Sequence, residues 1–131
     1  MAHTETRTLT QLELRIMKVI WREEEATVEK IQRLFKREGK PLALPSIRTM
    51  LGILQDKGYV TRRADGRRHV YTALVSQDEA RRTMLADLIA RAFDGSASVL
   101  VAAMIGSRMV SKKEVDEVKR LIGRFEKETG K

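Results

Sequence analysis

The sequence predicts a mainly α-helical chain with one small antiparallel β-hairpin. In six segments apolar residues recur every three or four positions, which is the spacing of one face of an α-helix. Between the third and fourth segments, two runs rich in β-forming residues flank Ala64-Asp65-Gly66, and Asp-Gly is a strong hairpin signal. With 42% hydrophobic residues and only 2 prolines among 131 residues, the chain can bury a packed core.

The first two helices are bounded by capping and breaking signals. Thr10 and Glu13 have the spacing of a capping box, which predicts a helix from there to about Arg22. Thr27 is placed to cap a second helix, which ends near the Gly and Pro of residues 38–41. The apolar positions of the first helix extend beyond one buried face, so we expect it to contact neighbours on both flanks.

A third helix follows, and its two faces differ in chemistry. Pro45 lies in its first turn or just before it, Ser46 is its cap or a first-turn residue, and Gly58 ends it. One face is a narrow apolar seam. The opposite face is small and polar apart from one long side chain, which suits close approach by a partner. It consists of Ser46, Arg48, Thr49, Gly52 and Gln55.

The hairpin after the third helix is strongly basic. Its predicted strands cover residues 59–63 and 67–72, and both carry arginines. Because residues 45–75 hold six basic and two acidic residues, the third helix and the hairpin form the candidate anion-binding surface. The hairpin arginines are Arg62, Arg63, Arg67 and Arg68.

Three further helices follow a predicted domain boundary between residues 75 and 76. Capping-box spacing opens two of them, and an apolar run fills residues 97–105. The roughly 55 residues from 76 to 131 are too few to bury three apolar faces alone, so we expect a helical dimerisation domain there, after a first domain of residues 1–75. The expected dimer contacts are Leu88, Phe93, Val99, Leu100, Val118, Ile122 and Phe125.

Composition argues against several classes of protein. The formal net charge of +8 favours an anionic partner such as nucleic acid. The chain has no cysteine, and His3 and His69 are far apart in sequence, so we expect no metal site, no cofactor and no enzymatic acid–base centre. The N-terminus lacks the apolar run of a signal peptide, and residues 97–105 are about half a membrane span, which favours a cytoplasmic protein that does not bind membranes.

Three helices followed by a two-stranded ribbon is the outline of a winged helix-turn-helix, which places its last helix in the DNA major groove. Such a helix needs short side chains where it approaches the bases, together with one or two long donors. The residues that meet this requirement are Ser46, Arg48, Thr49 and Gly52. The hairpin arginines can hold the neighbouring phosphates, so the expected partner is double-stranded DNA.

The residues also resemble the penicillinase repressor family of transcriptional regulators over nearly the whole chain. The most specific matches are LTQLELRIMKVIW at residues 9–21, SIRTMLGIL at 46–54 and KGYV at 57–60. The resemblance implies a repressor that binds an inverted-repeat operator through residues 46–54, in a β-lactam-response or related stress operon. It also implies a homodimer joined through the C-terminal helices.

Some features of that family do not carry over. Its members are inactivated when a sensor protease system cuts an Asn-Phe bond, whereas this chain has Ala102-Ala103 there, so a regulatory protease is an open possibility only. The copper-responsive relatives use a Cys-rich tail, and this chain has no cysteine. Gly52 replaces a longer polar residue that is often found in the family, so the resemblance does not imply the base preference at that position.

Two other hypotheses are open from the residues alone. One is an adaptor whose basic half binds an acidic protein. The other is a structural DNA-binding or RNA-binding protein without operator specificity. A discrete palindromic footprint on DNA distinguishes a repressor from both.

Overall fold

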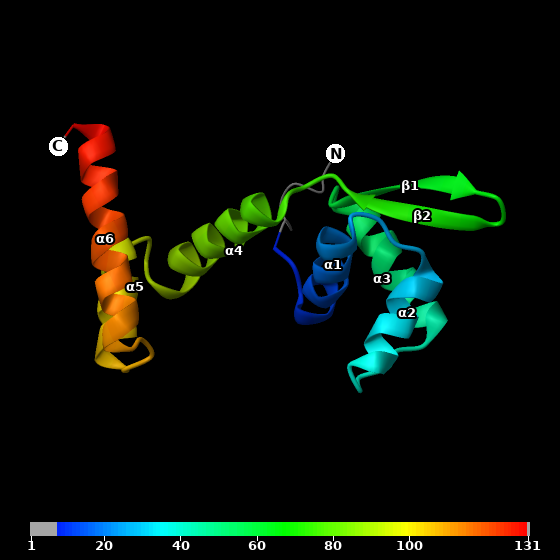
Figure 1. Cartoon of the computed structure of the whole chain (residues 1–131), viewed down its shortest axis with the longest axis horizontal. Coiled ribbons are helices and arrows are strands. Elements are labelled where there is room, and N and C mark those ends of the chain that lie inside the picture. The colour runs from blue at the N-terminus through cyan, green and yellow to red at the C-terminus, as the bar shows by residue number, and fades with distance from the viewer. Residues whose placement is uncertain (1–7, 131) are drawn as a thin grey trace. The chain divides into compact units, whose positions relative to one another are not determined.

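The computed structural model describes residues 8–130, which form six α-helices and one two-stranded antiparallel sheet (Figure 1). The order of elements is the predicted one, and the mainly α fold with a small hairpin is confirmed. His3 lies outside the described residues. The elements are α1 (Gln11–Glu23), α2 (Val28–Arg37), α3 (Leu44–Asp56), β1 (Val60–Asp65), β2 (Arg68–Ala73), α4 (Gln77–Ala92), α5 (Ala97–Gly106) and α6 (Lys112–Thr129).

The chain divides into two compact units, one ending at Asp87 and the other beginning at Leu88. The first unit holds α1 to α3, the hairpin and most of α4. Ala80 of α4 is fully buried and Met84 packs against the same core, which explains why the start of this helix belongs to the first unit.

Side-chain caps fix where several helices begin. The Thr10 hydroxyl accepts a hydrogen bond from the Glu13 N–H (3.2 Å), and the Glu13 carboxylate accepts one from the Thr10 N–H (2.9 Å), which confirms the predicted capping box. Equivalent reciprocal pairs open α4 and α6. The Thr27 hydroxyl accepts from the Lys30 N–H and caps α2, as predicted.

The recognition-helix candidate α3 begins without a side-chain cap. Ala43 is the N-cap residue and makes no side-chain hydrogen bond, whereas Pro45 and Ser46 both lie in the first turn. Of the two predicted roles for Ser46, the structure thus selects the first-turn position. Gly58 follows the helix with φ of +84°, in the left-handed region that favours glycine.

The hairpin turn lies one residue later than the sequence predicted. β1 continues through Asp65, which pairs with Arg68, so the two turn residues are Gly66 and Arg67. Gly66 has φ of +65°, and glycine at the first turn position is the pattern of a type II′ turn, whose twist matches that of the strands. Asp65 is therefore a strand residue, and Arg67 lies in the turn instead of on the second strand.

The core of the first unit lies where α1, α2 and α3 meet the base of the hairpin. Its side chains are mostly aliphatic, with one phenylalanine and two tyrosines among them, and Trp21 packs against them while remaining partly exposed. By packing against α3, these residues fix its orientation relative to α1, α2 and the hairpin. The largest fully buried side chains are Phe35, Ile16, Met17, Ile20, Ile31, Ile47, Leu51, Leu54 and Val60.

Two long-range contacts attach the hairpin and the segment after it to the helices. Ala26, between α1 and α2, exchanges two backbone hydrogen bonds with Tyr71 of β2, at 3.0 and 2.9 Å. The Trp21 indole N–H donates to the carbonyl oxygen of Val75 at 2.9 Å. These contacts hold the base of the hairpin in a fixed position beside α3.

A buried ion pair joins the start of α1 to the end of α3. The Lys57 ammonium lies 2.7 Å from the Glu13 carboxylate and also donates to the carbonyl oxygen of Thr8 at 3.1 Å. The side chains of Glu13 and Lys57 are only 4% and 15% exposed. The carboxylate that caps α1 is thus shared with the residue that ends α3.

The second unit leaves its apolar side chains largely uncovered. No residue of α5 or α6 is buried, and Ile122 and Phe125 are 53% and 63% exposed. Apolar side chains of α5, α6 and the loop between them line a small, partly open pocket of about 70 Å³. Within residues 8–130, no single helix is long and apolar enough to cross a membrane, and only α4 and α5 taken together, as a bent pair, meet that length and composition.

Candidate nucleic-acid interface

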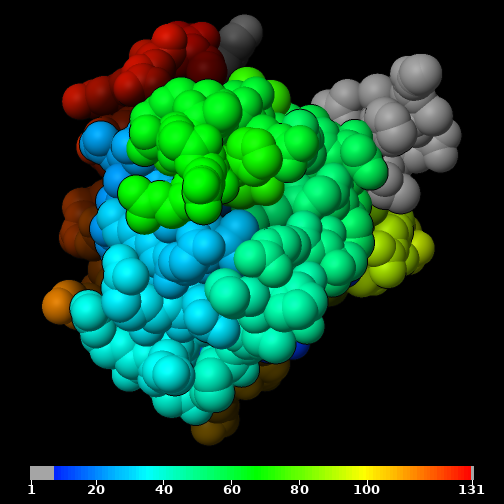
Figure 2. Space-filling view, turned by 90° about the vertical axis from the view of Figure 1, so that its right-hand side faces the viewer, coloured from blue at the N-terminus to red at the C-terminus, as the bar shows by residue number. Residues whose placement is uncertain are grey.

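The polar face of α3 is exposed on the surface of the first unit. Ile47, Leu51 and Leu54 are fully buried, so the opposite side of the helix points away from the core. Figure 2 shows this surface, with the hairpin in green beside α2 in cyan and α3 in blue-green. All four residues predicted for DNA recognition lie on that exposed side: Ser46, Arg48, Thr49 and Gly52.

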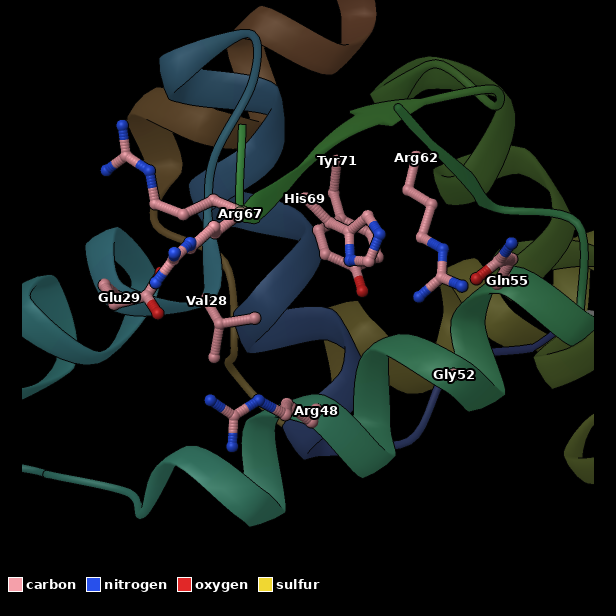
Figure 3. A pocket seen from close by; sticks show the side chains of 10 residues that line it. Val28, Glu29, Arg48, Gly52, Gln55, Arg62, Arg67, His69 and Tyr71 are labelled. Carbon is pink, nitrogen blue, oxygen red and sulfur yellow. The ribbon is translucent and has the colours of Figure 1, made fainter. Parts of the chain in front are cut away.

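A hollow of about 380 Å³ separates α3 from the hairpin (Figure 3). Two predicted residues of α3 line it, namely Arg48 and Gly52, while Ser46 and Thr49 lie outside it. From the hairpin it receives three of the four predicted arginines. Its full lining is Val28, Glu29, Arg48, Gly52, Gln55, Arg62, Arg67, Arg68, His69 and Tyr71.

The strand register distributes the arginines between the two faces of the hairpin. Arg62 pairs with Tyr71, and both side chains lie on the face that borders the hollow. Arg63 is the next residue and pairs with Val70, so its side chain points to the other face. There its guanidinium forms an ion pair with Glu25 at 3.0 Å.

Positive charge dominates the hollow. Glu29 is its single carboxylate, against four guanidinium groups. Within the described residues 8–130, Arg48, Arg62, Arg67 and Arg68 form no ion pair with a carboxylate, so their charges are available to an anionic partner. The same part of the chain holds no cluster of His, Asp and Glu suited to a metal ion.

Two of the three successive glutamates at residues 23–25, where α1 ends, are paired with neighbouring cations. Lys30 and Arg22 hydrogen-bond to the Glu23 carboxylate and hold its pKa below the ordinary value of 4.5. Glu25 is paired with Arg63. Because they are paired, Glu23 and Glu25 repel an anionic partner such as DNA less than unpaired glutamates would.

Sequence reasoning did not assign several residues of the hollow to the site. Gln55 was placed on the polar face of α3, and its distance of one turn from Gly52 is the signal that it belongs with that residue. His69 and Tyr71 lie on one face of β2 with Val70 between them on the other, so the strand register, which the sequence did not define, is what places them beside Arg62. Glu29 comes from α2, and no sequence pattern pointed to it.

The chain is similar to known regulatory proteins in sequence and to solved structures in fold. The methicillin resistance regulatory protein MecI of Mammaliicoccus sciuri is 23% identical over 120 residues, covering 88% of this chain and 94% of the relative. RosR of H. salinarum has a similar structure, with a TM-score of 0.51, 19% identity and coverage of 88% of this chain and 92% of RosR. The oxidised form of MarR from E. coli also has a TM-score of 0.51, at 12% identity over 94% of this chain and 79% of that protein.

The family assignment rests on a separate finding. Residues 9–124 match the family model described as Penicillinase repressor, and this span includes α3, the hairpin and most of α6. The chain therefore belongs to the penicillinase repressor family and is a DNA-binding transcriptional repressor, not an enzyme.

Proposed function

We propose that the protein acts in the cytoplasm as a homodimeric winged-helix repressor that binds an inverted-repeat operator. In this proposal α3 enters the major groove, the hairpin holds the adjacent backbone, and two copies bind two half-sites. The observation that carries the DNA contact is the hollow between α3 and the hairpin, where four guanidinium groups meet one carboxylate.

The two parts of this surface have different tasks. Arg48 and Thr49 are exposed on the helix and can reach base edges, with Ser46 at the first turn placed for the backbone. The hairpin supplies phosphate contacts, which give affinity and orientation but little sequence information. We assign these phosphate contacts to Arg62, Arg67 and Arg68 beside the hollow, and a separate one to Arg63 on the other face of the hairpin.

The homodimer is inferred from the second unit. Its helices are amphipathic or wholly apolar, yet none of the residues of α5 and α6 is buried. Exposed apolar patches of this extent are typical of protein–protein interfaces. Association with a second copy would cover Leu88, Phe93, Val99, Leu100, Val118, Ile122 and Phe125.

The regulated genes are proposed from the relatives. The MecI proteins that match this chain are named as methicillin resistance regulators, so we infer a β-lactam-response or related stress operon. Release from DNA must differ in detail from cleavage at an Asn-Phe bond, because the corresponding position in α5 is Ala102-Ala103. A protease acting at another bond is compatible with this proposal.

Genomic footprinting of the purified full chain tests the proposal, with Arg48→Ala and Arg67→Ala as matched variants. Discrete palindromic sites are expected. Arg48→Ala should reduce the ratio of operator to random-DNA affinity, whereas Arg67→Ala should weaken both about equally. Recovery of no palindromic site would overturn the repressor proposal, and equal effects of the two variants on that ratio would contradict the assigned division of tasks.

A further inference from the structure

Gly52 occupies a position where the free protein has no need of glycine. It lies inside α3, its backbone is not in the left-handed region, and its surface is exposed. A Cβ atom built at this position would meet no atom within 4 Å. Glycine destabilises a helix interior relative to alanine, because it costs more backbone entropy on folding. The reason for glycine must therefore be sought in a bound state.

The surroundings of Gly52 show what the missing side chain leaves open. Gly52 lies between Arg48, one turn earlier, and Gln55, almost one turn later, and all three line the hollow. Figure 3 shows Arg62 extending from the hairpin toward the turn of α3 that carries Gly52 and Gln55. The exposed backbone at Gly52 thus forms the α3 side, or floor, of the hollow, and the Arg62 guanidinium of the hairpin extends toward it.

We propose that this floor receives one phosphodiester group of the DNA, held jointly by Arg62 and Gln55, while Arg48 extends away from Arg62 (Figure 3) and is left for the base edges. Guanidinium groups bind phosphate oxygens through paired, charge-assisted hydrogen bonds, and the Gln55 amide can donate a further one. A side chain at position 52 would fill the space in which Arg62 and the phosphate meet. By leaving room for this phosphate, Gly52 allows α3 and the hairpin to bind the same group. This inference rests on the proposed DNA-binding function.

The test measures how the affinity of the full chain for a mixed-sequence DNA duplex falls with salt. Each lost phosphate contact reduces the magnitude of the slope of log K against log salt concentration by about 0.9. Arg62→Ala and Gly52→Leu should each reduce it by about that amount. The double variant should show the same reduction as Arg62→Ala alone, because both changes remove the same contact.

Arg63→Ala is the matched control, since Arg63 points to the other face of the hairpin and pairs with Glu25. Any reduction in the salt slope caused by Arg63→Ala should add to the reduction caused by Gly52→Leu, because the two changes affect different contacts. An unchanged slope in Gly52→Leu, or a combined reduction of about 1.8 in Gly52→Leu with Arg62→Ala, would overturn the proposed site. If the unmodified chain shows no salt-dependent DNA binding, the proposed function fails instead.

Stability provides a second measurement that does not depend on DNA. Gly52→Ala should melt at a higher temperature than the unmodified chain, because alanine is the stronger helix former and its Cβ meets open space. Higher stability together with weaker DNA binding in Gly52→Leu is the expected signature. A lower melting temperature in Gly52→Ala would mean that the fold itself requires glycine, which would also overturn the inference.

Discussion

Replacing Lys57 by methionine should destabilise the first unit more than any change to an exposed lysine. The change leaves the carboxylate of Glu13, whose side chain is 4% exposed, without its cationic partner at 2.7 Å. Breaking a buried pair by removing one member costs about 3 to 5 kcal/mol. Here the Thr10 N–H still donates to that carboxylate at 2.9 Å, so we expect a smaller cost of about 2 to 3 kcal/mol.

Urea unfolding of Lys57→Met measures this cost, and Lys18→Met is the control because Lys18 is exposed and no ion pair involves it among the described residues. The control should change the free energy of unfolding by less than about 0.5 kcal/mol. Adding Glu13→Gln to Lys57→Met should restore part of the loss, because a neutral amide is cheaper to bury than an unpaired carboxylate. A double variant less stable than Lys57→Met, or a Lys57→Met cost below about 1 kcal/mol, would refute the reasoning.

Three further predictions concern other contacts. Trp21→Phe should lower the free energy of unfolding in urea by about 1 to 3 kcal/mol, because the Val75 carbonyl loses its donor. Lys30→Met should raise the pKa of Glu23 toward 4.5 in an NMR titration. Because this pKa is lowered by folding, the ion pairs of Glu23 stabilise the fold above pH 4.5 and cease to do so as the carboxylate protonates. Ile122→Asp should shift sedimentation toward the monomer by placing a charge in the proposed interface.

Each of these predictions has a result that contradicts it. Unchanged stability in Trp21→Phe would mean that water replaces the indole as donor to Val75. An unchanged Glu23 pKa in Lys30→Met would assign the shift to Arg22 alone. Sedimentation of Ile122→Asp identical to that of the unmodified chain would exclude the exposed face of α6 as the dimer contact.

The sequence predicted the helices well because their signals are local. A capping box joins residues three positions apart, so the start of α1 follows from Thr10 and Glu13 alone. The period of the apolar residues likewise identifies the buried face of α3 without reference to any other element. Contacts distant in sequence left no such signal. Neither the pair of Glu13 with Lys57 nor the backbone bridge of Ala26 to Tyr71 was predicted.

The hairpin shows why the site was less predictable than the fold. Side chains alternate between the two faces of a strand, so a change of one residue in register would exchange the faces of Arg62 and Arg63. The sequence located the turn near Asp65 and Gly66 but did not fix which residue of β2 pairs with each arginine. The observed pairing of Arg62 with Tyr71 places this arginine opposite Gly52, while Arg63 is taken up by Glu25. A basic hairpin can therefore be recognised from composition, but which of its arginines acts with α3 is decided by the register.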